Sequence, residues 1–267
     1  MGRVTGDGTV GKALEVLDQV AAFGRPVRFG ELLAESTFPK PTLYRFVQTL
    51  TNQHMLSYDP DRQTYSPGLR LVRLAHAAWD QSTLAPVARP HIDALSAAVG
   101  ETVHLAQLDH AQVLYIDKRN ANNPVEMYSQ AGKIGPAYCT GVGKVMLAFI
   151  DEEAAEDAIG QQSFHRFTEH TLASADALRA ELTDIREHGY GFDREEHEPG
   201  IICIAMPILT EAGRVLGALS VTSTTSRTNL AGLESFEPVL RETARKIARD
   251  ASNWSFPDYN TKETTRI

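Results

Sequence analysis

Four side chains in the C-terminal half of the chain are of types that bind metals or attack substrates: Cys139, Asp193, His197 and Cys203. Together they could hold a transition metal, but metal sites more often show tight Cys or His pairs, so we expect no metal and no cofactor. A cysteine nucleophile would need an activating base, and only His197 lies near in sequence. The simpler interpretation places His197 at the surface and packs Cys203 as a small buried hydrophobe.

A glycine-rich run, Ala137-Tyr-Cys-Thr-Gly-Val-Gly-Lys144, precedes an apolar stretch at 145–149. A phosphate-binding loop would need Gly at position 138 and Ser or Thr at 145, where this chain has Tyr138 and Val145, so nucleotide binding is disfavoured. What remains is a turn that leads into a helix. Its first N–H groups, left open because Gly141 has no side chain, could bind an anion. A helix cap packed for close approach is the equal alternative.

Two hydroxyls stand two residues apart in a β-prone segment, at Ser220 and Thr222. This spacing puts both on one face of a strand, either in a site or toward solvent. Glu196, in the loop before 201–209, is expected to be a structural carboxylate that holds loop N–H groups.

The pattern around these residues predicts an α+β domain on an antiparallel sheet. Apolar and β-branched runs separated by turns predict strands at 102–108, 112–118, 125–130, 201–209 and 215–222. Helical periodicity predicts helices at 86–99, 143–150, 151–160, 174–188 and 233–252. Hairpin-linked strands with helices gathered outside them are typical of this class.

The N-terminal region reads as a helix-turn-helix followed by a wing. A first helix over 10–21 precedes a short helix, a Ser/Thr/Pro turn and a second helix that runs to Leu50, with Pro41 suited to its first position. A hairpin over 57–65, with an Asp-Pro-Asp turn, resembles a wing. The residues expected to meet phosphates or base edges are Lys40, Thr42, Tyr44, Arg45, Gln48, Thr49 and, near the wing tip, Arg62. A plain pair of amphipathic surface helices is the alternative.

Charge is divided unevenly along the 267 residues. Residues 1–75 carry a net charge of +2 and the rest −10, which fits a small nucleic-acid module joined to an acidic domain. Two cysteines give no disulfide framework, and neither a secretion signal nor a membrane span is evident, so we expect a cytoplasmic protein without membrane contact. The expected domains are 8–67 for DNA binding, 68–82 as a linker helix, 83–255 as a second domain and 256–267 as a flexible tail.

Three blocks resemble the IclR family of bacterial transcriptional regulators. They are Phe38-Pro-Lys-Pro-Thr-Leu-Tyr-Arg45, the run that ends at Lys144, and Gly191-Phe-Asp-Arg-Glu-Glu-His-Glu-Pro-Gly-Ile-Ile-Cys-Ile-Ala205. The resemblance spans about residues 8–255, although Pro41 stands where the family more often has Ser. It implies a winged helix-turn-helix, a linker helix and a GAF-like effector domain. It also implies dimers that pair through the N-terminal modules and often assemble into tetramers.

The resemblance also implies a site and a function. The matching positions of the family face an effector pocket, here Met127, Gly141, Val142, Asp193, Cys203, Ser220 and Thr222. Backbone N–H groups, hydroxyls and one carboxylate suit a small carboxylate effector such as a keto or sugar-derived acid. We therefore expect a ligand-responsive repressor of a catabolic operon that binds double-stranded DNA. An aromatic-acid-responsive activator and a cysteine-dependent GAF-type enzyme are the alternatives.

Overall fold

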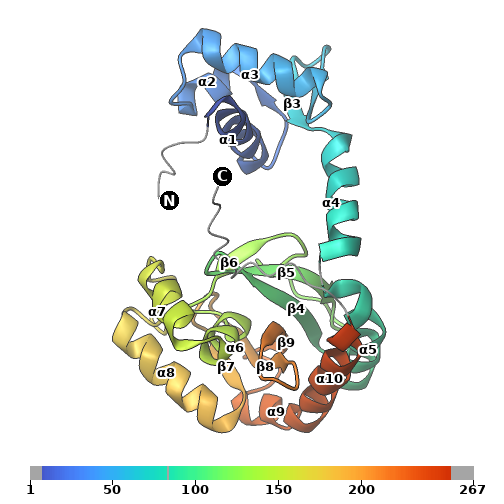
Figure 1. The fold of residues 1–267 in the computed structure, drawn as a ribbon, viewed down its shortest axis with the longest axis vertical. Helices are drawn as coiled ribbons and strands as arrows, with labels where there is room; N and C mark the ends of the chain where they lie inside the picture. Colours follow the sequence, from blue (N-terminus) through green and yellow to red (C-terminus); the bar gives the residue numbers. More distant parts are fainter. Residues whose placement is uncertain (1–7, 83, 254–267) are drawn as a thin grey trace, which may run out of the picture. The chain divides into compact units, whose positions relative to one another are not determined.

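The computed structural model describes residues 8–82 and 84–253, so position 83 and the tail expected at 256–267 lie outside the described residues. The chain divides into two compact units, Met1–Gln81 and Ser82–Ile267, each with its own apolar core (Figure 1). Within the described ranges, no helix combines the length and apolar character needed to cross a membrane.

The N-terminal unit is a winged helix-turn-helix, as the sequence predicts. Its helices are α1 (Gly8–Ala22), α2 (Phe29–Glu35) and α3 (Lys40–Asn52), and its strands are β1 (Val27–Arg28), β2 (Leu56–Asp59) and β3 (Thr64–Pro67). The strands pair antiparallel in the order β1-β3-β2. The apolar faces of the three helices close on one core, which includes Val16, Val20, Leu32, Leu43 and Val47.

The recognition helix begins one residue earlier than predicted. Pro39 is the N-cap of α3 and Lys40 its first residue, so Pro41 takes the second helical position. The N–H group at that position also lacks an intrahelical partner, so proline costs no hydrogen bond there. In the turn before it, the Phe38 ring packs edge-on against Phe46 of α3, with centroids 5.7 Å apart.

A single helix, α4 (Leu69–Ser82), follows the wing. Arg70 at its start donates to the backbone carbonyl and the side chain of Gln53, each at 3.0 Å, which ties α4 to the end of α3. Leu69, Val72 and Leu74 are nevertheless largely exposed.

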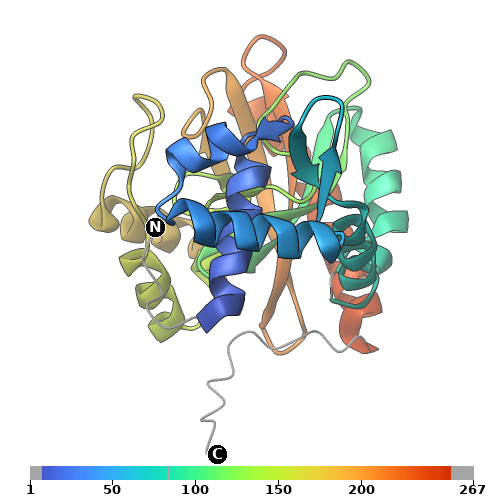
Figure 2. The same cartoon turned by 90° about the horizontal axis from the view of Figure 1, so that it is seen from above.

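A six-stranded antiparallel sheet forms the centre of the C-terminal unit, in the order β6-β5-β4-β9-β8-β7. The strands are β4 (Thr102–Asp109), β5 (Gln112–Arg119), β6 (Ile134–Pro136), β7 (Gly191–Arg194), β8 (Ile201–Leu209) and β9 (Val215–Thr224). The helices are α5 (Ala85–Val99), α6 (Gly141–Phe149), α7 (Glu152–Gly160), α8 (Ala175–His188), α9 (Leu230–Glu234) and α10 (Glu237–Asp250), with a 3-10 turn at Ala251–Asn253. Within this unit, α5 and α10 cover one side of the sheet, and α6, α7 and α8 lie on the other (Figures 1 and 2).

Two predictions about this unit are wrong. Residues 125–130 are not a strand, because β6 occupies the sheet edge beside β5 and the Tyr128 N–H donates to the Glu198 carboxylate at 3.1 Å. The helix expected at 233–252 is broken into α9 and α10. Pro238 explains the break, because it lacks the N–H that would continue the helix from Glu234.

Candidate functional site

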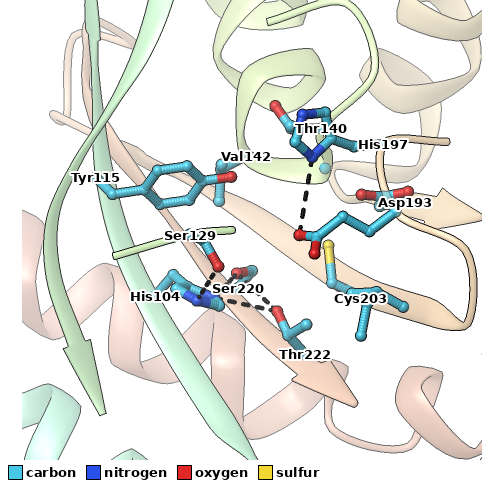
Figure 3. Close-up of a pocket in the computed structure, with 13 residues that line it drawn as sticks. His104, Tyr115, Ser129, Thr140, Val142, Asp193, His197, Cys203, Ser220 and Thr222 are labelled. Carbon is cyan, nitrogen blue, oxygen red and sulfur yellow. Dashed lines mark hydrogen bonds and ion pairs between the residues drawn. The ribbon is translucent and has the colours of Figure 1, made fainter. Parts of the chain in front are cut away.

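A pocket lies between the first turn of α6 and the sheet (Figure 3). The empty space within it, open solvent included, is about 380 Å³. The lining residues are His104, Tyr115, Ser129, Thr140, Gly141, Val142, Asp193, His197, Glu198, Ile201, Cys203, Ser220 and Thr222. None of these described residues is Lys or Arg, so an anionic ligand would have to be held by N–H and hydroxyl groups.

Strand pairing places the polar side chains of the pocket on one face of the sheet. Cys203 on β8 lies directly opposite both Asp193 on β7 and Thr222 on β9. Ser220, two residues before Thr222, lies opposite His104 on β4. Opposed residues of antiparallel strands, and residues two apart on one strand, share a face. Ser220 and Thr222 are buried, so their interpretation as solvent-facing polar residues is wrong.

The N-terminus of α6 points at the pocket. The N-cap residue Thr140 donates its hydroxyl to the Pro136 carbonyl at 2.7 Å and does not cap the helix. The first N–H groups of an α-helix have no intrahelical partner and favour negative charge. A Cβ at Gly141 would lie 2.5 Å from Cys203 Sγ and 3.2 Å from Ala205 Cβ, so only glycine permits this approach. Close packing and open N–H groups therefore coexist at this position.

His104 is the centre of a buried hydrogen-bonded group. Its Nε2 lies 2.8 Å from Ser129 Oγ, and its Nδ1 lies 3.2 Å from Thr222 Oγ1 and 3.4 Å from Ser220 Oγ. Burial, and to a lesser degree the charge of Lys118, lowers the pKa of His104 to about 3. The imidazole is therefore neutral at physiological pH, with one nitrogen donating and the other accepting.

Asp193 lies across the pocket from His104 (Figure 3). Its Oδ1 accepts the Glu196 N–H at 2.8 Å. Burial, and after it the negative charge of Glu196, raises the pKa of Asp193 to about 7. Near neutral pH this carboxyl therefore exists in both protonation states, as a donor in one and an acceptor only in the other.

A buried ion-pair group supports the turn before α6 and the loop after β7. Lys144 of α6 is fully buried and pairs with Glu196 and, at 3.0 Å, with Glu181 of α8. Arg194 also binds Glu181, at 2.7 Å. The sequence predicts loop N–H groups as the partners of Glu196, but its main partner is Lys144, and only a 3.4 Å bond from the Arg194 N–H fits that prediction.

His197 is not a surface residue, contrary to the prediction. Its side chain is only 13% exposed and pairs with Glu198 at 3.8 Å. Its ring packs against Tyr128 and Phe167, with centroids 5.2 Å and 4.7 Å away. Aromatic residues from two other loops thus hold it at the edge of the pocket.

The cysteines are not set up for nucleophilic chemistry. Cys139 and Cys203 are both buried, and burial followed by the charge of Asp193 raises the pKa of each thiol. A nucleophilic cysteine needs the opposite shift, toward the thiolate. Within the described ranges, no three His, Cys, Asp or Glu side chains converge as metal ligands would, the candidates Cys139, Asp193, His197 and Cys203 included.

The structure brings together most residues predicted for the pocket. Gly141, Val142, Asp193, Cys203, Ser220 and Thr222 are in its lining, whereas Met127 is buried but outside it. Six further lining residues were not predicted for the pocket: His104, Tyr115, Ser129, Thr140, Glu198 and Ile201. For His104 a signal existed, because a histidine inside an apolar strand is a polar residue that must find partners.

The predicted DNA-binding residues lie on the outer side of α3 and on the wing. Lys40, Tyr44, Arg45 and Thr49 are exposed, while Thr42 and Gln48 are half-buried. Thr49 donates its hydroxyl to the Arg45 carbonyl at 2.8 Å, which leaves its methyl group for outside contacts. Arg62, in the loop between β2 and β3, has a side chain 78% exposed and only a 4.0 Å pair with Asp59.

Comparison with known proteins gives a family match for each of the two units. The family model of the IclR helix-turn-helix domain matches residues 9–60, and that of the bacterial transcriptional regulator IclR C-terminal domain matches residues 76–249. The HTH-type transcriptional regulator KdgR of Escherichia coli is 33% identical over 93% of this chain and 95% of its own length. XynR of the same organism is 30% identical over 90% and 96%.

Solved structures show the same fold. The Thermotoga maritima IclR structure covers 90% of this chain and 97% of its own, with 27% identity and a TM-score of 0.72. The C-terminal domain of Escherichia coli KdgR covers 62% and 97%, with 35% identity and a TM-score of 0.56. The chain therefore belongs to the IclR family of DNA-binding transcriptional regulators.

Proposed function

We propose that this protein is a cytoplasmic repressor of a catabolic operon that releases its DNA when a small organic acid occupies the pocket of the C-terminal unit. α3 and the wing bind the operator through Lys40, Thr42, Tyr44, Arg45, Gln48, Thr49 and Arg62. The effector contacts Gly141, Val142, Asp193, Cys203, Ser220 and Thr222. Repression is supported by a relative named as the DNA-binding transcriptional repressor YiaJ of Escherichia coli, 30% identical over 79% of this chain.

The observation that carries the proposal is the uncapped N-terminus of α6 facing buried hydroxyls. Because no lining Lys or Arg competes for it, a ligand carboxylate is best placed on the N–H groups at Gly141 and Val142. Ser220 and Thr222, on the sheet below, can donate to or accept from hydroxyl or carbonyl groups elsewhere on the ligand. A keto acid or sugar-derived acid has both parts.

The test is binding to the DNA that lies upstream of the gene for this protein. The purified protein should retard this DNA, and an effector acid should release it and be recovered chemically unchanged. An aromatic acid that increases transcription instead would support the activator alternative. Conversion of the acid to a product would reject a purely regulatory role.

A further inference from the structure

The wall of the pocket formed by β4, β5, β9 and the loop at 120–133 is made of neutral hydrogen-bonding groups. The hydroxyls of Ser129, Ser220 and Thr222 surround the His104 imidazole, and the Tyr115 ring packs against it (Figure 3). Ser129, Ser220, Thr222 and His104 are each at most 7% exposed. The carboxylates of the pocket, Asp193 and Glu198, come instead from β7 and the loop that follows it.

This wall has an unused hydrogen-bonding group. The Tyr115 side chain is 7% exposed, its ring packs edge-on against His104 with centroids 5.5 Å apart, and its hydroxyl points into the pocket (Figure 3). Among the described residues, nothing forms a hydrogen bond with that hydroxyl. The hydroxyl is not among the fully buried unpaired side-chain atoms, so it faces the open part of the pocket, where a ligand group can pair with it.

His104 makes the wall adaptable. A neutral imidazole always presents one donor and one acceptor, and exchange of its tautomer reverses the roles of Ser129 on one side and of Ser220 and Thr222 on the other. The hydroxyls can thus turn donors or acceptors toward the ligand as required. Vicinal hydroxyl groups of a ligand can use these donors and acceptors, whereas an alkyl or phenyl group forms no hydrogen bond with them and leaves the Tyr115 hydroxyl without a partner.

We propose that His104 is a specificity-determining residue that, with Tyr115 and Ser129, selects acids whose carbon chain bears several hydroxyl groups over short 2-oxo acids and aromatic acids. The inference rests on the proposed function, in which the carboxylate of the same ligand occupies the N-terminus of α6. To this function the inference adds His104 and its neighbours, which recognise the hydroxylated carbon chain at the other end of the ligand.

Calorimetric titration of the full chain with D-gluconate, 2-keto-D-gluconate, pyruvate and benzoate tests the proposal. The wild type should bind one of the hydroxylated acids at least about tenfold tighter than pyruvate or benzoate. The variant His104→Phe keeps an aromatic ring but removes both nitrogens. Its affinity for this hydroxylated acid should fall about tenfold or more, while its affinities for pyruvate and benzoate should change less than about threefold. His104→Gln, whose amide keeps a donor and an acceptor, should retain more of the preference than His104→Phe.

A second variant covers the case in which His104→Phe does not fold. Tyr115→Phe removes only the unpartnered hydroxyl, so this variant should fold normally, and its affinity for the hydroxylated acid should still fall several-fold. Wild-type preference for pyruvate or benzoate would overturn the inference but leave an acid-responsive regulator. Equal losses for all acids in the folded variants would reduce His104 and Tyr115 to structural roles. If the wild type binds no acid and none releases upstream DNA, the proposed function fails with it.

Discussion

At the residue scale, Asp193 is the pocket group whose protonation changes near neutral pH. It is buried beside Glu196, and its pKa of about 7 lies above the usual aspartate value of 3.8. Lys144 and His197 oppose this shift with their charges but do not cancel it. An ionised Asp193 is therefore a cost to the fold, which the proposed role in ligand binding would explain.

Replacing Asp193 by Asn should make the protein more stable at alkaline pH. Because the folded-state pKa is raised, the contribution of Asp193 to stability is fully present below about pH 4 and is lost as the pH rises through about 7, on the order of 1.4 kcal/mol for each pH unit between the two pKa values. Asn keeps the acceptor for the Glu196 N–H and never ionises. Urea unfolding of both proteins should show a gap at pH 8 that closes toward pH 4.5.

The same variant separates stability from function. Asp193→Asn should lose about 1–3 kcal/mol of effector binding, or roughly five- to 150-fold in affinity, while free protein still binds operator. Ser220→Ala should weaken effector binding by a similar amount through one lost hydroxyl. A variant less stable than wild type at pH 8 would mean that an ionised Asp193 supports the fold.

Arg45 offers the corresponding test on the DNA-binding unit. It is exposed on α3, where it stacks near the Phe46 ring at 5.6 Å, so its removal should not disturb the core. Arg45→Ala should weaken operator binding by about 1–3 kcal/mol if the guanidinium reads a base edge. If the guanidinium contacts only phosphate, affinity for operator and for random DNA should fall equally, and affinity should depend less steeply on salt concentration. Fluorescence anisotropy at several salt concentrations distinguishes these results, and unchanged binding to both DNAs removes Arg45 from the interface.

At the element scale, the seating of α6 on β8 decides whether the pocket exists. A Cβ on Gly141 would press against Cys203 Sγ at 2.5 Å, so Gly141→Ala should push the helix N-terminus away and abolish effector binding. Gly160→Ala, at the end of α7, is the matched control, because nothing lies within 4 Å of its added Cβ. Calorimetry on both variants checks the claim. Normal effector affinity in Gly141→Ala would place the ligand elsewhere.

The buried pairs of Lys144 connect α6 to α8 and to the loop after β7. Lys144→Met leaves Glu196 buried without its counter-charge and should cost about 3–5 kcal/mol of stability near neutral pH. Arg179→Ala removes a cation from exposed pairs with Glu156 and Asp176, where water screens the charges, so it should cost much less stability than Lys144→Met. Urea unfolding compares the two, and equal small losses would show that solvent reaches the Lys144 site.

Helices α3 and α8 could be predicted because each buries one face and so shows helical periodicity. Strands β4, β8 and β9 are buried along most of their length, and they could be predicted as apolar, β-branched runs between turns. The segment 125–130 failed because its β-prone residues bond to Glu198, a partner distant in sequence that no local pattern reveals. β7 went unpredicted because Gly191–Arg194 is too short to show alternation.

The residues of the pocket also divide into those that the sequence could reveal and those that only the fold brings together. The positions in its lining that were predicted came from blocks shared with a family. His104 and Ser129 lie 25 residues apart in sequence and meet only through the fold. Tyr115 reaches the site because the pairing of β4 with β5 shifts register between Leu105 and Ala106. Such irregularities in strand pairing leave no local pattern in the sequence.

At the scale of the whole molecule, charge and exposed apolar surface point to more than one copy acting together. Residues 1–75 have a net charge of only +2, which gives one module little attraction for DNA. The same unit exposes Val10 and Leu14 on α1, and Leu69 and Val72 on α4. Exposed apolar side chains grouped on helices mark surfaces that another chain can cover.

We therefore predict a homodimer, or a tetramer built from dimers, that pairs through these N-terminal residues. Two-fold pairing would place operator half-sites about one helical turn apart or a multiple of it, and footprinting should show that spacing. Leu69→Glu with Val72→Glu should shift the mass from light scattering toward a monomer, or from tetramer to a smaller species. Operator affinity should fall much more than affinity for a single half-site.

Ala77→Glu is the control for this experiment, because it adds a carboxylate to an exposed position on a different side of α4. Its mass and operator affinity should stay close to those of the wild type. A wild type that is monomeric at micromolar concentration yet binds one half-site tightly would contradict the prediction. So would a doubly substituted protein that keeps both its mass and its operator affinity, since the exposed apolar side chains of α4 would then have no part in assembly.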